Sequence, residues 1–272
     1  MRLFARSKRP VERRPETPPG ALIYAIGDVH GRGDLLERLI CAILADAAAR
    51  KSARAPEIVF VGDYVDRGPD SAGVIDQVLA LRERDDVVVH CLKGNHEETV
   101  LSFLDDARAG PVWAEFGGMQ TLASYNVAAP QVRSDLEAWE TARLAFAQAV
   151  PDRHLAFLRA LELYVVAGDY VFVHAGLRPG VPLAGQTEQD LLWIRREFLE
   201  ATRPFEKVVV YGHTPQRDAV VEPHRIGIDT GAFVTGVLTA LRLSGREAAL
   251  IQTTGPDAGA QAPPIGFRTV WS

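Results

Sequence analysis

Short apolar runs and helical repeats alternate over the first hundred residues. The runs "ALIYAI", "EIVF" and "VVVHCL" each stop close to a Gly-Asp or Gly-Asn pair, as buried strands often do. Between the first two runs, leucine and isoleucine recur every three or four residues, which predicts an amphipathic helix over residues 33–50. A second helix is predicted over "DSAGVIDQVLALRER", with Asp70 or Ser71 as its N-cap. Three such β-loop-α units predict a largely parallel sheet.

The pattern changes twice in the rest of the chain. Residues 97–162 are typical of helices interrupted by glycines, with a long amphipathic piece from about Ser134 to Ala149, and we expect a helical insertion there. From Leu163 onward the pattern favours short strands, beginning with a hairpin signal in "LYVVAGDYVFVHAG". One helix with a capping-box start, "TEQDLLWIRREFLEA", interrupts these strands.

Composition is that of a globular protein. The 272 residues are 47% hydrophobic and 24% charged, and we expect one catalytic-sized domain over residues 21–272. Residues 1–20 hold six arginines and lysines against two glutamates, so a basic, disordered tail is expected there. The net charge of −5 gives no basic field for phosphate backbones, and nucleic acid is not an expected partner.

The sequence also carries expectations about location. No stretch approaches the roughly 20 apolar residues that span a bilayer, and the first residues lack a signal-peptide pattern. We therefore expect a cytoplasmic protein. Cys41 and Cys91 are the only cysteines, have no CxxC spacing and lie in apolar runs, so both are expected to be buried, reduced thiols.

Five predicted strand ends carry side chains that bind metals or phosphate. They are "GDVHGR", "GDYVDRG", "GNHEE", "VHAG" and "YGHTP". Each taken singly is more often a turn or a structural histidine. Because strand ends of an α/β sheet gather ligands at one edge, all five together favour a shared site. His90, His154 and His224 lack this setting, and structural or surface roles are expected for them. The candidates are Asp28, His30, Asp63, Asp66, Arg67, Asn95, His96, His174 and His213.

The ligand types indicate a transition-metal site. Carboxylate, amide and imidazole ligands without thiolates suit Mn, Fe, Zn or Co. Two such ions about 3.5–4 Å apart can hold a hydroxide and clamp a phosphoryl group during in-line displacement. An extended "DVH" tripeptide would direct Asp28 and His30 to the same side of the backbone, toward one ion.

The five motifs, in this order, resemble the signature of the calcineurin-like metallophosphoesterases. Within that family they are similar to the phosphoprotein phosphatase branch, with its bacterial and phage-type serine/threonine protein phosphatases. The resemblance runs from about Ala21 to Gly231. It implies an α/β (α+β) four-layer fold, with two mixed β-sheets in a sandwich flanked by helices. It also implies two divalent transition-metal ions per chain, with manganese as first choice and iron, zinc or cobalt as alternatives.

Two ligand sets follow from the resemblance. The set implied for the first ion is Asp28, His30 and Asp63. The set implied for the second ion is Asp63, Asn95, His174 and His213. Asp63 would therefore bridge the two ions.

The resemblance also implies the proton donor. His96 would be the general acid, oriented by Asp66. This agrees with elementary chemistry, because an imidazole with a pKa of about 6.5 can donate a proton at neutral pH. A carboxylate at the other ring nitrogen fixes the tautomer and supports the imidazolium.

Phosphate binding is assigned in the same way, to Arg67, Asn95 and Arg195. A guanidinium forms paired, charge-assisted hydrogen bonds with phosphate oxygens. We choose Arg195 over Arg196 from the Trp-x-Arg pattern in "WIRR", and Arg196 is the surface alternative.

The leading hypothesis is a phosphomonoester hydrolase, specifically a serine/threonine protein phosphatase, acting on a phosphoprotein or a small phosphoester. The alternative is a symmetrical bis(5'-nucleosyl)-tetraphosphatase. Those relatives typically show "ARG" and "GNHD" where this chain has "DRG" and "GNHE", so Asp66 and Glu97 favour the phosphatase. A non-catalytic metal-binding scaffold is less favoured, because no ligand is missing. "IDTGAF" resembles the bacterial type, and no regulatory subunit is expected.

Overall fold

The computed structural model describes residues 14–52, 54–254 and 265–270. The strands are β1 Leu22–Ile26, β2 Glu57–Phe60, β3 Val88–Cys91, β4 Tyr164–Ala167, β5 Tyr170–Val173, β6 Val208–Tyr211, β7 Val220–Glu222, β8 Arg225–Gly227, β9 Thr239–Ser244, β10 Glu247–Thr253 and β11 Ile265–Thr269. The helices are α1 Gly33–Arg50, α2 Ser71–Arg82, α3 Asn95–Asp105, α4 Gly110–Glu115, α5 Gly118–Ser124, α6 Leu136–Ala149, α7 Asp152–Arg159, α8 Glu188–Trp193, α9 Arg196–Leu199 and α10 Ala232–Thr235. Short 3₁₀ turns cover Ala107–Ala109 and Leu183–Gly185.

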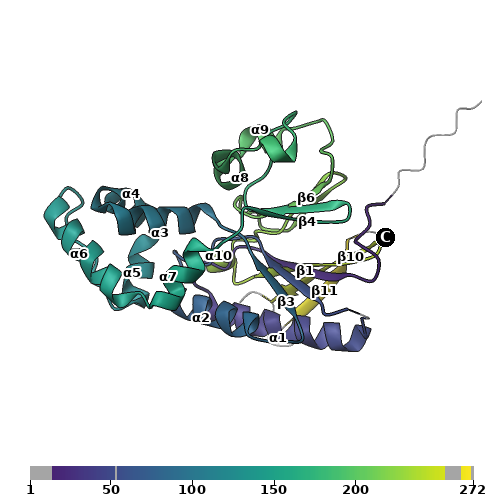
Figure 1. Cartoon of the computed structure of the whole chain (residues 1–272), viewed down its shortest axis with the longest axis horizontal. Helices are drawn as coiled ribbons and strands as arrows, with labels where there is room; N and C mark the ends of the chain where they lie inside the picture. Colours follow the sequence, from purple (N-terminus) through teal and green to yellow (C-terminus); the bar gives the residue numbers. More distant parts are fainter. Residues whose placement is uncertain (1–13, 53, 255–264, 271–272) are drawn as a thin grey trace, which may run out of the picture.

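Two mixed sheets stack on each other (Figure 1). The six-stranded sheet has the order β11-β10-β9-β1-β2-β3, and the five-stranded sheet has the order β4-β5-β6-β8-β7. Strands β1, β2 and β3 are parallel, as the βα units predict. The prediction of a largely parallel sheet was wrong for the other half, because β9 pairs antiparallel with β1 and extends the sheet through β10 and β11. The fold class, two mixed sheets flanked by helices, is confirmed.

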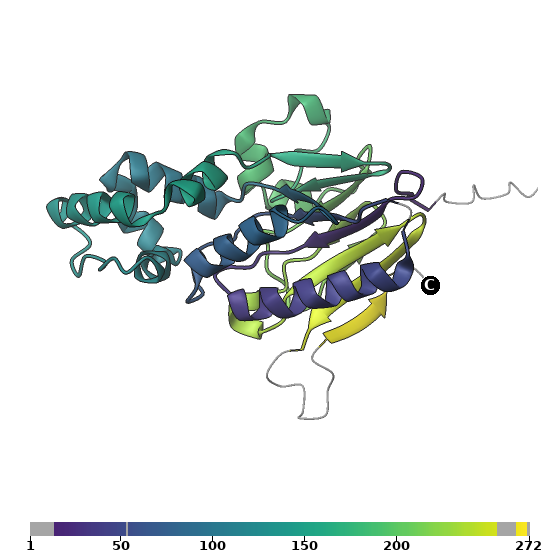
Figure 2. The same cartoon turned by 60° about the horizontal axis from the view of Figure 1, so that its bottom comes forward.

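Burial of β1 on both faces explains its unbroken apolar sequence. Tyr24 and Ile26 join the core beneath the helices, whereas Ile23 and Ala25 join the core between the sheets. Helix α1 runs along the outer face of the six-stranded sheet (Figure 2). Helices α8 and α9 pack on the outer face of the five-stranded sheet, where Phe198 contacts the core. The order of layers is therefore helix, sheet, sheet, helix.

Several predicted elements are confirmed. Helix α1 occupies the range expected for it, and the β4–β5 hairpin forms at "LYVVAGDYVFVHAG". Asp70 caps α2, because its side chain accepts a hydrogen bond of 2.9 Å from the Gly73 amide. Helices α3 to α7 form a group beside the sandwich, on the left of Figure 1.

The helix predicted over "TEQDLLWIRREFLEA" is two helices. Thr187 opens α8 with the expected capping box. The backbone then leaves the helix at Ile194, with ψ of 140°, and resumes helical geometry only in α9. Arg195 lies in this break. The break directs its side chain toward the sheet edge, where an uninterrupted helix would not place it.

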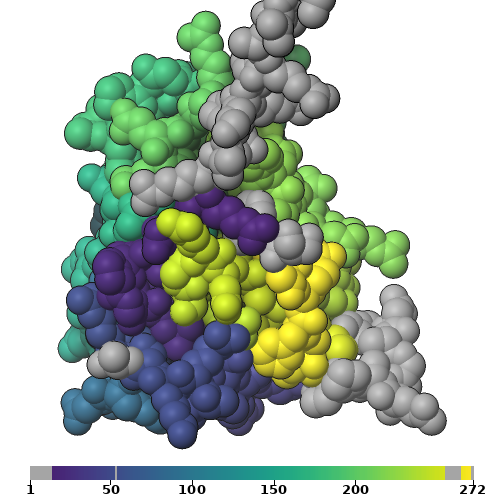
Figure 3. All heavy atoms as spheres, turned by 90° about the vertical axis from the view of Figure 1, so that its right-hand side faces the viewer, coloured from purple at the N-terminus to yellow at the C-terminus, as the bar shows by residue number. Residues whose placement is uncertain are grey.

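The N-terminal segment packs on the sandwich where the structure describes it. Thr17 is buried and exchanges hydrogen bonds of 3.0 and 2.9 Å with Gly245 in the β9–β10 turn. Figure 3 shows the N-terminal segment, in purple, against the yellow-green β9–β10 hairpin. Residues 1–13, most of the expected tail, lie outside the described residues. The division into a tail and one catalytic domain stays a prediction.

Cys41 corrects one expectation. Cys91 is buried at the end of β3, as predicted, but Cys41 is exposed on α1. Its position in "RLICAIL" lies on the solvent side of the helical repeat, which an apolar run alone does not reveal. Among the described helices, none has the length and apolarity that crossing a bilayer requires.

Candidate metal centre and active site

The candidate side chains meet where the strands of both sheets end. Strands β1, β2 and β3 deliver the first three motifs from one sheet, and β5 and β6 deliver the last two from the other. The parallel arrangements β1-β2-β3 and β5-β6-β8 bring these carboxyl ends to a common edge. All six predicted ligands are at most 7% exposed: Asp28, His30, Asp63, Asn95, His174 and His213.

Backbone strain concentrates in the same place. Seven non-glycine residues in the described part of the chain have positive φ, and five of them are candidate site residues. These five are His30, Asp63, Asp66, Arg67 and His213. A left-handed conformation is unfavourable for such side chains and persists only where the surroundings enforce it. The strain supports a functional role for this edge, independently of the motif resemblance.

Two groups of ligand atoms share one carboxylate. His30, Asp63 and His96 place one ligand atom each within 4.8 Å of one another, and Asp63, His174 and His213 do the same. Asp63 belongs to both groups, as a bridging ligand must. Gly94 permits this approach, since a Cβ there would collide with the Asp63 side chain.

The histidines are held in tautomers suited to a cation. His30 Nδ1 lies 2.8 Å from the Val65 carbonyl oxygen, and His174 Nδ1 lies 2.9 Å from that of Val61. A carbonyl oxygen only accepts, so Nδ1 carries the proton and Nε2 keeps its lone pair. Burial lowers the pKa of both imidazoles, and that of His213, which favours the neutral form that binds metals.

Asn95 lies at the centre of the second group. Its Oδ1 is 2.8 Å from both His174 Nε2 and His213 Nδ1, so three ligand atoms converge. Arg195 reaches the same group from the break between α8 and α9, donating from Nε to His213 Nε2 at 2.9 Å. Arg196 instead lies on the surface, paired with Glu200 at 3.1 Å.

The position of Asp28 differs from the one that an extended "DVH" tripeptide predicts. The "DVH" tripeptide is not extended, because His30 has φ of 46°, and Asp28 is absent from both ligand groups found among the described residues. Asp28 Oδ2 accepts a hydrogen bond of 2.8 Å from the His213 amide. Its buried Oδ1 has no hydrogen-bond partner among the described residues. A buried carboxylate oxygen without a donor fits a cation ligand, and that assignment stays a prediction.

Asp229 lies at the same edge and was not predicted as a site residue. It follows β8, and one of its oxygens also lacks a partner among the described residues. Burial, together with the charge of Asp229, raises the pKa of Asp28. Burial, with the nearby Asp63 charge, raises the pKa of Asp229 to about 6. The signal was available, since "GIDTG" is a further strand end that carries an aspartate, with a glycine two residues away on each side.

The predicted acid and its partner are in contact. His96 Nδ1 lies 2.6 Å from Asp66 Oδ2, and both residues are buried. Asp66 also accepts hydrogen bonds from Trp113 Nε1 at 2.9 Å and from Thr121 Oγ1 at 2.5 Å. Burial opposes protonation of His96, but Asp63 and Asp66 outweigh it and raise its pKa. Trp113 and Thr121 come from α4 and α5, so the helical group supports the active site directly.

Arg67 lies between the two imidazoles. Its terminal nitrogens are 2.8 Å from His30 Nε2 and 3.0 Å from His96 Nε2. Its guanidinium lies 4.9 Å from the ring centre of Phe233. Gly117 permits this placement by accepting from the Arg67 amide at 3.2 Å, in a close approach that a Cβ would block. The guanidinium thus sits beside the first ligand group, and its phosphate-binding role stays a prediction.

Glu97 has a role that the sequence analysis did not foresee. The fully buried carboxylate accepts hydrogen bonds from the backbone amides of Asp63, Tyr64, Val65 and Gly94, at 2.8 to 3.3 Å. Burial and the Asp63 charge raise its pKa to about 7. Glu97 therefore links the loop of Asp63, the predicted bridging ligand, to the start of α3.

The histidines set aside earlier lie elsewhere. His154 is buried between the Tyr125 hydroxyl and Asp76, each at 2.8 Å. His90 is part of β3 and approaches Glu162 at 3.4 Å. Neither belongs to a ligand group in the described part of the chain, and nor does His224.

Comparisons with known proteins agree with the site. The chain is 26% identical to a bis(5'-nucleosyl)-tetraphosphatase PrpE (asymmetrical) from Anoxybacillus flavithermus, covering 86% of this chain and 96% of that protein. The identity is 29% to the protein of the same name from Halalkalibacterium halodurans, covering 80% and 88%. A crystal structure of a cold-active protein tyrosine phosphatase, 18% identical, superposes with a TM-score of 0.59 over 94% of this chain and 83% of that one, which shows a shared fold.

The family match covers most of the chain and every candidate site residue. Residues 21–232 match the family described as calcineurin-like phosphoesterase. This range includes all five motifs as well as Arg195 and Asp229. The chain belongs to the calcineurin-like phosphoesterase family.

Proposed function

We propose that this chain is a two-metal hydrolase of phosphoesters. The observation that carries the proposal is the shared Asp63, which joins two ligand groups beside the His96–Asp66 pair and the Arg67 guanidinium. The first ion would be held by Asp28, His30 and Asp63, and the second by Asp63, Asn95, His174 and His213. Two divalent ions, with manganese preferred, supply the charge neutralisation and water activation that in-line attack on phosphorus needs.

The protein groups complete the reaction. Arg67 presents a guanidinium for two oxygens of the transferred phosphoryl group, and Asn95 and Arg195 approach it from the second ligand group. His96 would carry the proton for the leaving oxygen at Nε2, 3.8 Å from Asp63 Oδ2, once the Arg67 nitrogen that donates to Nε2 in this structure turns to the phosphate. Asp66 accepts from Nδ1 and stabilises the protonated ring before transfer.

Two substrate classes have separate support. The curated relatives are named as asymmetrical bis(5'-nucleosyl)-tetraphosphatases, which favours a dinucleoside polyphosphate. The alternative predicted from the sequence was a symmetrical bis(5'-nucleosyl)-tetraphosphatase. The names of the relatives favour the asymmetrical enzyme instead. The buried His96–Asp66 pair favours a phosphoserine or phosphothreonine, because a serine alkoxide is far more basic than a nucleotide phosphate and depends more on an acid.

Side-by-side turnover with Mn²⁺ tests both classes. Wild-type protein and His96→Asn are assayed for phosphate or nucleotide release from a phosphoserine peptide and from diadenosine tetraphosphate. If the monoester is the substrate, wild type favours the peptide, and His96→Asn lowers its kcat by about 10²- to 10⁴-fold. If the dinucleotide is the substrate, wild type favours it and the variant loses less. Wild-type protein that releases product from neither would refute the proposal.

Four further expectations accompany the proposal. Manganese as the native ion, a cytoplasmic location, the lack of a regulatory subunit and a single catalytic domain all stay predictions from the sequence.

A further inference from the structure

A hollow opens directly beside the candidate active site. Its volume is about 990 Å³, close to the upper end of the range for small-molecule sites. Three segments line it: the loop 215–218 after the β6 motif, the region 230–237 around α10, and the strand ends at Gln252 and Gly266. The first two segments begin two residues after His213 and one residue after Asp229, so the hollow lies next to the candidate metal centre.

Phe233 joins the hollow to the phosphate-binding group. Its ring lines the hollow. The same ring packs edge-on against His30, with centres 5.4 Å apart, and stands 4.9 Å from the Arg67 guanidinium. A phosphate bound at Arg67 would therefore have the rest of its molecule next to this ring.

The walls of the hollow combine apolar side chains with the guanidinium of Arg217. Phe233, Pro215 and Val234 give apolar contact, and Val234 is 73% exposed. Arg217 is exposed at the rim and has no ion-pair or hydrogen-bond partner among the described residues. The carboxylate of Asp218, exposed beside Arg217, also lines the hollow, and threonine and glutamine side chains complete the lining. This set suits a flat heterocycle against the apolar wall and a second anionic group at Arg217.

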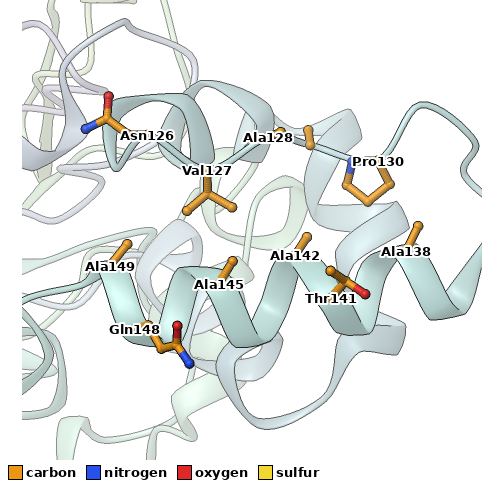
Figure 4. A pocket seen from close by; sticks show the side chains of 11 residues that line it. Asn126, Val127, Ala128, Pro130, Ala138, Thr141, Ala142, Ala145, Gln148 and Ala149 are labelled. Atoms are coloured by element: carbon orange, nitrogen blue, oxygen red, sulfur yellow. The ribbon is translucent and has the colours of Figure 1, made fainter.

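A second hollow provides a contrast. It lies between residues 126–130 and α6, and its lining is mostly alanine with no charged side chain (Figure 4). It contains none of the candidate site residues. Of these two hollows, the one at Phe233 couples a stacking surface and a guanidinium to the candidate metal centre.

We propose that the hollow bounded by Pro215, Arg217, Phe233 and Val234 binds the nucleoside and a distal phosphate of a nucleoside polyphosphate whose reacting phosphate lies at Arg67. The inference rests on the proposed function, since it requires a phosphate at the metal centre. Arg217 pairs with a phosphate beyond the reacting one, and the base packs on Phe233 and Val234. The hollow thereby selects between the two substrate classes in favour of the dinucleotide.

The test uses full-length protein with Mn²⁺ and two variants, Arg217→Ala and Val234→Asp. The control is Val112→Asp, the same change at an exposed valine on α4, outside the hollow. The kcat/KM is measured for diadenosine tetraphosphate and for β-glycerophosphate, which has no base and no second phosphate. The ratio of the two values should fall about tenfold in both variants, through KM of the dinucleotide, and stay within about twofold in the control.

The outcomes separate the inference from the proposed function. An unchanged ratio in both variants, or hydrolysis of a phosphoserine peptide but not of the dinucleotide, overturns the inference and leaves the hydrolase proposal standing. If wild type hydrolyses nothing, the hydrolase proposal fails, and calorimetric titration with ADP tests the hollow alone. An affinity for ADP about tenfold weaker in Arg217→Ala than in wild type supports the hollow, and equal affinity overturns it.

Discussion

The Nδ1 atom of His96 lies 2.6 Å from Oδ2 of Asp66, within a pocket closed by Trp113 and Thr121. Asp66 thus contacts the His96 imidazole on one side and helices α4 and α5 on the other. A buried imidazole would ordinarily lose its proton, but the carboxylates of Asp63 and Asp66 raise the His96 pKa. The two carboxylates therefore favour the protonated form of His96, which the proposed role as general acid requires.

Asp66→Asn should shift the pH profile of hydrolysis. Removing the Asp66 charge lets His96 lose its proton more readily, so the alkaline limb of kcat moves to lower pH. We expect kcat on a phosphoserine peptide at pH 8 to fall by about 10²-fold or more. The measurement is kcat between pH 5 and 9. Asp70→Asn is the matched control, because asparagine also caps a helix. An alkaline limb that stays in place would remove Asp66 from this role.

Glu97→Gln should destabilise the protein and impair the metal centre. The two carboxylate oxygens accept from four backbone amides, whereas glutamine offers one oxygen and turns an amino group toward two of the donors. Leaving two buried donors unpaired costs about 2–6 kcal/mol of unfolding free energy. Thermal or urea unfolding measures this loss.

Glu98→Gln is the control for that variant. Glu98 accepts one hydrogen bond, from Trp193 Nε1 at 2.5 Å, and a glutamine oxygen can replace that acceptor. The control should unfold within about 1 kcal/mol of wild type. Equal unfolding free energies of the Glu97 and Glu98 variants would show that the four hydrogen bonds accepted by Glu97 do not stabilise the fold.

The two cysteines should differ in reactivity. Cys41 is exposed, whereas burial raises the pKa of Cys91 to about 12. At pH 8 a disulfide reagent should modify one thiol in the native protein and two after unfolding. Since the folded pKa exceeds the ordinary value of 9.0, the stabilisation from the protonated thiol is complete below pH 9 and is lost between 9 and 12. Rapid modification of both native thiols would contradict the burial of Cys91.

The sequence predicts that the motif residues gather at one sheet edge, and the structure places them there. Asp63, Asn95 and His174 each follow an apolar run, and parallel pairing alone brings such residues to one edge. The groups that support them come from contacts distant in sequence. Trp113 approaches Asp66 across 47 positions, and no local pattern marks such a contact.

The positions of two other side chains, Arg195 and His30, depend on backbone conformations that differ from those their sequence patterns predict. The position of Arg195 requires a helix break at Ile194, inside a sequence with a continuous helical pattern. The orientation of His30 requires a left-handed backbone, which the extended-strand assumption for "DVH" excludes. Both residues make contacts distant in sequence, Arg195 with His213 and His30 with Val65, which no local pattern predicts.

The central claim, a two-metal phosphoester hydrolase, is tested most directly by metal titration. Chelator-treated protein is titrated with Mn²⁺ while bound metal and phosphate release from a phosphomonoester or diadenosine tetraphosphate are measured on the same samples. The account predicts two ions per chain, with turnover rising until the second ion binds, and loss of both in Asp63→Asn. Full activity in the chelated protein, or saturation at one ion or none, would contradict it.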